Sequence, residues 1–123
     1  MNFVGFRKPR VKKEPHLRFI RGLPCCVCLN NIETQAAHVR FSIDGKMNPG
    51  MQQKPDDKWT VPLCNRHHTD QHGMEEQAFW LTVGIDPIKL AAMLFAVSGN
   101  HEAGEHVVLK AARGEIVHAG RER

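Results

Sequence analysis

Residues 59–72 read WTVPLCNRHHTDQH, and this stretch decides the fold that the sequence predicts. Its apolar first half is typical of a short strand, and the polar residues from Asn65 onward favour a helix because no breaker occurs before Gly73. Cys64 and His67 then occupy positions i and i+3 at the start of that helix, so both side chains face the same side. This pair supplies half of a tetrahedral metal site.

The other half lies upstream, in residues 25–28 (CCVC). Cys25 and Cys28 have the two-residue spacing of a zinc knuckle, a tight turn whose backbone amides face the sulfurs. Together with Cys64 and His67 they predict a closed, four-coordinate structural zinc site.

The residues leave three alternatives to this zinc site. The thiols are simply buried beside a surface histidine, or Cys26 replaces Cys25 although only one residue separates it from Cys28. In the third, His68 is the zinc ligand and His67 is exposed.

His68 and His72 form a second pair at positions i and i+4 of the same helix, where both rings reach one metal ion. His67 is rotated from them by about 100° around the helix axis, so one helix can serve two metals. The alternative is that His68 and His72 are exposed polar residues.

Two segments link the knuckle to the helix. Residues 32–41 favour a strand that carries His38, and residues 42–58 contain glycine, proline and aspartate without periodicity. A loop of that length in a small domain is usually functional or mobile.

The rest of the chain completes a three-part division. Residues 74–83 favour a helix, and Asp86-Pro87 starts another that ends near residues 98–100. Residues 107–109 and 116–117 suggest two short strands. We therefore expect a basic arm over residues 1–15, a folded domain over 16–99, and a tail over 100–123 that forms a short hairpin.

Charge is distributed unevenly over the 123 residues, whose net charge is +4. Residues 1–21 hold seven basic residues and one acidic residue, a net +6, and the remainder carries −2. A basic arm favours a polyanionic partner, although a solvated tail has the same composition. The N-terminal residues lack the apolar core of a secretory signal and no apolar run approaches the ~20 residues of a membrane helix, so we expect a cytoplasmic protein without a membrane partner.

The order of these motifs resembles the HNH family of ββα-metal endonucleases, in its zinc-containing treble-clef form. The resemblance covers roughly residues 16–82, about half the chain, and is carried by Cys25-x2-Cys28, Ala37-His38, Asp56-Asp57, Cys64-x2-His67-His68 and His72. It is strongest to small phage and prophage members. It implies an α+β fold, a small treble-clef ββα-metal domain with an added C-terminal helix, and metal-dependent hydrolysis of DNA phosphodiester bonds in recombination or processing.

The resemblance also implies roles for individual residues. His38 is the general base, since neutral imidazole accepts a proton near neutral pH. His68 and His72 hold a catalytic Mg²⁺ or Mn²⁺, and Asp57 orients His38 where family members often use Asn. Ala37 departs from the Asp or His that often supplies a further metal ligand, and the acids that can fill that place are Asp44, Asp57 and Asp70.

DNA is the expected partner, contacted with little sequence specificity. The residues expected to meet its phosphates are Arg7, Lys8, Arg10, Lys12, Lys13 and Arg40. The resemblance also raises a recombinase filament as a protein partner. The alternative function is a non-catalytic zinc module that binds DNA or protein, and an RNA-binding ribbon is a weaker third because exposed aromatic residues are not evident.

Overall fold

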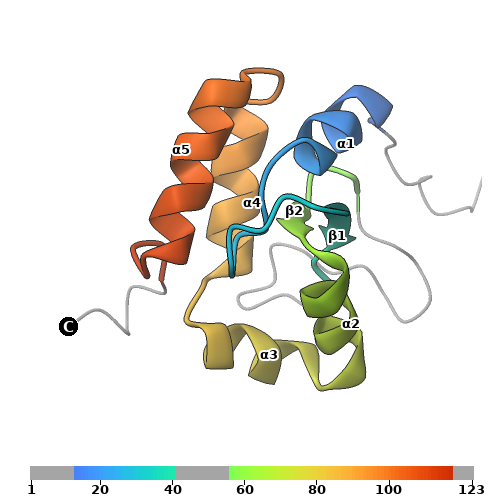
Figure 1. Ribbon diagram of the computed structural model, residues 1–123, viewed down its shortest axis with the longest axis vertical. Coiled ribbons are helices and arrows are strands. Elements are labelled where there is room, and N and C mark those ends of the chain that lie inside the picture. The colour runs from blue at the N-terminus through green and yellow to red at the C-terminus, as the bar shows by residue number, and fades with distance from the viewer. Residues whose placement is uncertain (1–12, 41–55, 118–123) are drawn as a thin grey trace, which may run out of the picture.

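The computed structural model describes residues 13–40 and 56–117, which form a mixed α+β fold (Figure 1). Within these ranges the chain forms five helices and one two-stranded sheet. In chain order the elements are α1 (Glu14–Arg21), β1 (Gln35–His38), β2 (Thr60–Leu63), α2 (Asn65–Gly73), α3 (Glu76–Val83), α4 (Pro87–Ala96) and α5 (His101–Ala112).

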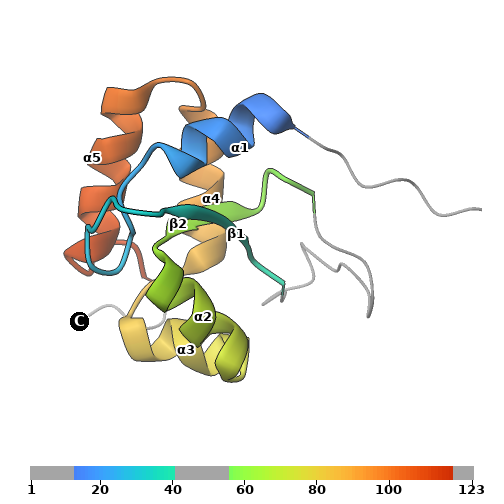
Figure 2. The same ribbon diagram turned by 45° about the vertical axis from the view of Figure 1, so that its right-hand side comes forward.

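The sheet is a small antiparallel pair at the centre of the molecule. Its register places Gln35 opposite Leu63 and His38 opposite Thr60. All four residues of β2 are buried, because α1, α2 and α4 all pack against this strand. Figure 2 shows α1 on one side of the sheet and α2 with α3 on the other. The short strands predicted around His38 and before Cys64 are thus confirmed in shorter form.

The helices after the sheet begin where side chains cap them. Asp86 accepts hydrogen bonds from the backbone N–H of Ile88 (3.1 Å) and Lys89 (3.2 Å) at the start of α4, with Pro87 in the first turn, as the sequence predicted. Glu75 caps α3 in the same way, and Gly84 ends that helix at φ 75°, a left-handed conformation that glycine adopts without strain.

The C-terminal segment corrects one prediction, because residues 101–112 form helix α5 and the expected strand at 107–109 is absent there. The run Val107-Val108-Leu109 suggested a strand, yet the buried positions 104, 107, 108 and 111 follow the helical spacing i, i+3, i+4, i+7. Asn100 caps the helix by accepting from Ala103 N at 3.1 Å. Helical periodicity with a good cap therefore outweighed the local β preference of valine.

The N-terminal boundary also differs. The helix α1 begins at Glu14, with Pro15 in its first turn, so residues 14 and 15 are helical and do not extend the arm. Residues 1–12, 41–55 and 118–123, which include most of the predicted arm, loop and tail end, lie outside the described residues.

One hydrophobic core joins all these parts. It runs from Cys25 and Cys64, through Val61 and Leu90, to Ile116 after α5. The segment expected as a separate tail is therefore packed into the same core as the cysteines, and Figure 1 shows α5 lying beside α4. No single helix in the described ranges is long and apolar enough to span a membrane, and the one pair that passes that test together, α3 with α4, is bent by 78°.

Candidate metal centre and histidine site

The four predicted zinc ligands come together at the junction of the knuckle and α2. The ligand atoms of Cys25, Cys28, Cys64 and His67 all lie within 4.8 Å of one another. Sγ of Cys28 is 3.9 Å from Sγ of Cys64, and Nδ1 of His67 is 3.6 Å from Sγ of Cys25 and 3.3 Å from Sγ of Cys64. The residues are thus positioned to bind one metal ion.

These separations fit zinc. A tetrahedral ion with bonds of about 2.3 Å to sulfur and about 2.05 Å to nitrogen places sulfurs ~3.8 Å apart, and sulfur and nitrogen ~3.6 Å apart. The three distances given above lie within about 0.3 Å of those values, and all pairs lie within 4.8 Å. Since all four positions are filled by protein atoms, the site is compatible with a structural zinc.

Local backbone geometry explains how the ligands converge. Cys25 N–H donates to Asn30 O (2.9 Å) and Leu29 N–H donates to Cys25 O (2.8 Å), which closes the knuckle turn with Leu29 at φ 65°. Val27 N–H points at Sγ of Cys25, 3.4 Å away, as amides do in a zinc knuckle. Cys64 is the N-cap of α2, so His67 follows on the same side of the first turn.

The alternative ligand Cys26 is excluded from this cluster. Its side chain is fully buried and its N–H donates to Pro62 O of β2 at 3.0 Å, which fixes the residue against the sheet. Cys26 is therefore a small packed side chain outside the cluster, and its amide attaches the knuckle to strand β2.

The thiols of the cluster differ in acidity. Burial raises the pKa of the Cys25 thiol to about 11. Burial also raises the pKa of Cys64, but hydrogen bonds from the His67 backbone and from the Cys28 and Cys25 side chains outweigh it, so this pKa lies below the ordinary value. Because a metal ion binds thiolates, its uptake must displace protons, and acid must weaken its binding.

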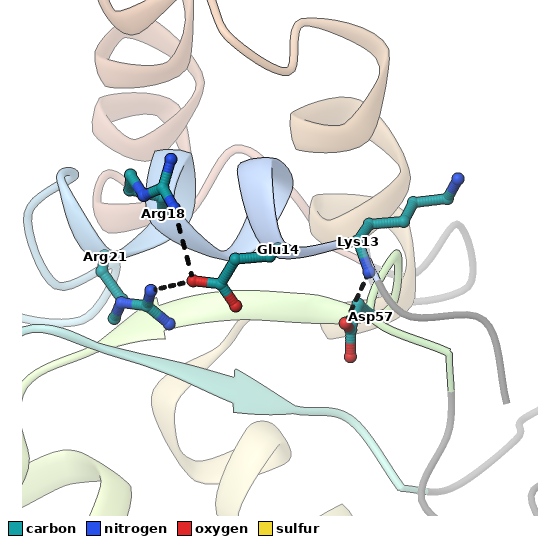
Figure 3. A network of polar contacts seen from close by, with 5 residues as sticks. All are labelled: Lys13, Glu14, Arg18, Arg21 and Asp57. Carbon is teal, nitrogen blue, oxygen red and sulfur yellow. Dashed lines mark hydrogen bonds and ion pairs between the residues drawn. The ribbon is translucent and has the colours of Figure 1, made fainter.

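A second set of polar side chains lies at one end of the β1–β2 sheet, beside His38 and Thr60. The buried carboxylate of Asp57 accepts a hydrogen bond from Nε2–H of His38 at 3.0 Å. Its other oxygen accepts from Lys13 N–H at 2.7 Å (Figure 3). Thr60 Oγ1–H donates to the Asp57 carbonyl at 2.8 Å. Since Nε2 keeps its proton and donates it in a hydrogen bond to the carboxylate, the lone pair of the neutral His38 ring is on Nδ1.

The histidine pair on α2 is also formed. Nε2 of His68 and Nε2 of His72 are 3.1 Å apart, and Nδ1–H of His68 donates to Oε1 of Gln35 on β1. That contact leaves the lone pair of neutral His68 on Nε2, facing His72. The pKa of His68 lies below its ordinary value because of burial and because His72, His38 and Arg40 add positive charge nearby.

The His68–His72 separation suits a shared ion. Two imidazole nitrogens bonded to one ion at about 2.05 Å lie between ~2.9 Å, for a right-angle arrangement, and ~3.3 Å, for a tetrahedral one. The same 3.1 Å also suits a hydrogen bond from His72 Nε2–H to His68 Nε2.

The remaining predicted site residues are not all brought to the histidines. Ala37 is fully buried in the core, so this position faces the interior. Asp70 is exposed on α2, and Arg40 is exposed just after β1. The residues Arg7, Lys8, Arg10, Lys12 and Asp44 lie outside the described ranges.

Basic residues of α1 are partly neutralised within the helix. Glu14 accepts from Arg21 at 2.7 Å and lies 3.9 Å from Arg18 (Figure 3). The ammonium of Lys13 instead lies 5.7 Å from the centre of the Phe95 ring, and that of Lys58 lies 5.6 Å from the same ring. The two lysines therefore gather positive charge around the Phe95 ring.

Three contributors to the site were missed at the sequence level: Gln35, Gln71 and Glu76. Gln71 donates to His38 O at 3.2 Å and to Oε2 of Glu76 at 2.8 Å. Glutamines are common on surfaces, and the only available signal was that Gln71 lies one turn from His68, where a polar residue can face the same side.

Comparison with known proteins gives one family. A family model described as "Protein of unknown function (DUF968)" matches residues 3–97. No curated protein and no solved structure matches the chain.

Proposed function

The chain belongs to the DUF968 family, whose description assigns no function, and we propose from the site itself that it is a metal-dependent endonuclease that hydrolyses DNA phosphodiester bonds. The observation that carries the proposal is that β1 and α2, which Gln71 joins, carry a His38–Asp57 contact and a His68–His72 pair, apart from the Cys/His cluster. The proposed fold is correspondingly a treble clef around a ββα-metal unit of HNH type.

The His38–Asp57 contact supports a base at this site. The buried carboxylate holds Nε2–H, so Nδ1 of a neutral ring is the atom that can take a proton from water. The Lys13 amide and the Thr60 hydroxyl hold Asp57 in place. The Asp57 carboxylate in turn orients the ring of His38.

The His68–His72 pair supports a divalent ion, Mg²⁺ or Mn²⁺, beside that base. Gln35 holds His68 in the tautomer whose Nε2 can bind a cation. When bound, such an ion supplies charge stabilisation for the phosphate and for the leaving oxygen. Two protein ligands leave coordination positions for phosphate and water, in contrast to the closed cysteine cluster.

Charge supports an anionic substrate. The ammonium groups of Lys13 and Lys58 lie over Phe95, and residues 1–12 add four basic residues. Contacts of this kind bind phosphates without reading bases. A recombinase filament as partner and a cytoplasmic location remain predictions.

The buried Ala37 favours a second candidate, a non-catalytic zinc module that binds DNA or protein. A metal ligand at this position, which HNH endonucleases often have, would face the core. The histidine pair therefore has one ligand fewer than the metal site of many HNH endonucleases. The cluster of Cys25, Cys28, Cys64 and His67 and the basic residues suit a non-catalytic module equally well.

Plasmid nicking by the full-length, zinc-loaded chain separates the two candidates. With Mg²⁺ or Mn²⁺ we expect nicking that falls about 10²–10⁴-fold in His38→Ala, because a general base typically contributes that factor. The matched control is His106→Ala, on the exposed face of α5, which should nick as the wild type does. Zinc content and circular dichroism verify that each variant is folded.

Two outcomes contradict the proposal in different ways. A wild type that binds DNA with zinc bound but never nicks it favours the non-catalytic module. Nicking that survives His38→Ala in a folded, zinc-loaded variant means that His38 is not the base.

A further inference from the structure

Two glutamines join the histidine-bearing elements in opposite directions. Gln35 on β1 accepts from the ring of His68 on α2, and Gln71 on α2 donates to the carbonyl of His38 on β1. His38 and His68 are therefore each held by a side chain from the element that carries the other.

Glu76, at the start of α3, holds the second of these contacts in place. Its Oε2 accepts from Nε2 of Gln71 at 2.8 Å and from the indole N–H of Trp80 at 3.0 Å. Arg40 N–H lies 3.2 and 3.3 Å from the two carboxylate oxygens. The carboxylate thus connects α2, α3 and the residue that follows β1 by two positions.

The contacts at Glu76 favour a carboxylate over an amide. Gln71, Trp80 and the Arg40 amide all donate, and an ionised carboxylate is a pure acceptor. Replacing it by an amide of the same size turns one oxygen into a donor, which faces Arg40 N–H in one orientation of the amide and faces Gln71 and Trp80 in the other. Hydrogen bonds to a charged acceptor are also the stronger kind.

The orientation of Gln71 is fixed as well. Both partners of its Nε2, the carbonyl of His38 and the Glu76 carboxylate, can only accept, so the amide nitrogen must face them. Gln71 is buried, and its Oε1 has no hydrogen-bond partner within the described part of the chain. The amide keeps this orientation although one buried acceptor is left unsatisfied.

We infer that Glu76, acting through Gln71, is a positioning residue that sets the separation between His38 and the His68–His72 pair. Gln71 lies between His68 and His72 on α2, and its partner is the backbone of His38 itself. Loss of the Glu76 carboxylate releases that contact while leaving the cysteine cluster untouched. The consequence for catalysis rests on the proposed function, whereas the consequence for the histidine rings does not.

The test compares Glu76→Gln with Glu75→Gln in the full-length, zinc-loaded chain. Glu75 lies next to Glu76 and caps α3 through Ala78 N, an acceptor role that glutamine retains, so the control removes the same charge from the same helix start. In Glu76→Gln we expect kcat for plasmid nicking to fall by up to about 100-fold, as a misplacement near 1 Å does, with KM unchanged. Glu75→Gln should behave as the wild type.

A readout independent of activity is the histidine ring spectrum. The ¹H–¹³C ring signals of His38 and His68 should shift or broaden in Glu76→Gln and stay in place in Glu75→Gln. Unchanged signals together with unchanged kcat overturn the positioning role. If the wild type does not nick at all, the proposed function fails, but the ring signals still decide this inference.

A double-mutant cycle tests whether Glu76 acts through Gln71. Gln71→Leu removes the contact to His38, while Trp80 and Arg40 still donate to Glu76. If Glu76→Gln loses its zinc or its fold, Gln71→Leu alone serves as the test variant. We expect the effects of Gln71→Leu and Glu76→Gln on kcat to be far less than multiplicative. Fully multiplicative effects mean that Glu76 acts by another route and contradict the inference.

Discussion

At the scale of single residues, His16 shows how burial sets a titration. Its ring lies between Phe19 and Phe95, its Nδ1 is 2.7 Å from Ser98 Oγ, and the residue is only 3% exposed. Burial lowers its pKa below the ordinary 6.5, with Asp57 opposing and Lys13 adding to the shift. The ring therefore links α1 to the end of α4 in its neutral form.

This depressed pKa predicts a loss of stability in mild acid. Above pH 6.5 both folded and unfolded states hold a neutral ring, and His16 adds no pH dependence. Below it the unfolded state takes up a proton that the folded state refuses, so the free energy of unfolding falls by at most about 1.4 kcal/mol per pH unit until the folded pKa is reached. Urea unfolding from pH 8 to 5.5, with zinc saturating, measures this.

His16→Gln is the comparison, because it keeps a polar side chain but cannot titrate. The wild type should lose more stability than the variant over the acid range, and their difference isolates His16 from the zinc ligands. Parallel curves for the two proteins would contradict the prediction.

At the same scale, spacing predicted the residues that share one helix or one turn. It predicted three pairs, and the structure brings the members of each pair together: Cys25 with Cys28, Cys64 with His67, and His68 with His72. The contact between His38 and Asp57 also formed as expected, while its catalytic role remains a prediction. Gln71 and Glu76 could not be found this way, since their partners include backbone atoms whose positions depend on the whole fold.

At the scale of elements, α1 and α5 approach closely because residue 104 has no side chain. A Cβ built on Gly104 would lie 2.7 Å from Cζ of Phe19 and 3.1 Å from Cδ2 of Leu23. The two helices are the first and the last of the described chain, so this contact packs its N-terminal part against its C-terminal part.

Gly104→Ala should therefore destabilise the protein, although alanine favours a helix. We expect the overpacking to lower the free energy of unfolding by about 1–3 kcal/mol in urea unfolding at neutral pH. Gly73→Ala on α2 is the matched control, since nothing lies within 4 Å of its added Cβ, and it should be neutral or stabilise by up to about 1 kcal/mol. A Phe19→Leu change should restore part of the loss, and equal behaviour of the two alanine variants would refute the clash.

Element boundaries were predictable where a cap or a breaker marked them. Asp86-Pro87 fixed the start of α4, and Gly84 the end of α3. Helix α5 was missed because three adjacent apolar residues resemble a strand, and the smaller residues that complete its buried face, Gly104 and Ala111, carry little hydrophobic signal on their own.

At the scale of the whole molecule, the metal ligands belong to the same core as the C-terminal helices. Cys25 and Cys64 lie in one cluster with Leu94, Val108 and Ile116. A chain of 123 residues has a limited core, and a structural metal adds folding free energy directly.

Removing the metal should thus loosen the entire fold. We expect one zinc per chain, a cooperative thermal transition that shifts down or disappears on chelation, and its return when zinc is added back. Cys64→Ser should lose the zinc, whereas Cys26→Ala, which changes a buried thiol outside the quartet, should retain it. Metal analysis with thermal circular dichroism checks both, and a chain that melts identically without zinc would show that the cluster is not structural.

The amide that reaches Asp57 belongs to the backbone of Lys13, and this has a consequence for how the sequence can drift. Every amino acid except proline carries that N–H, so position 13 can exchange its side chain freely and still hold the carboxylate. A position that looks variable among relatives would then hide an invariant contact. Selection on the charge of residue 13 can proceed independently of the geometry around His38.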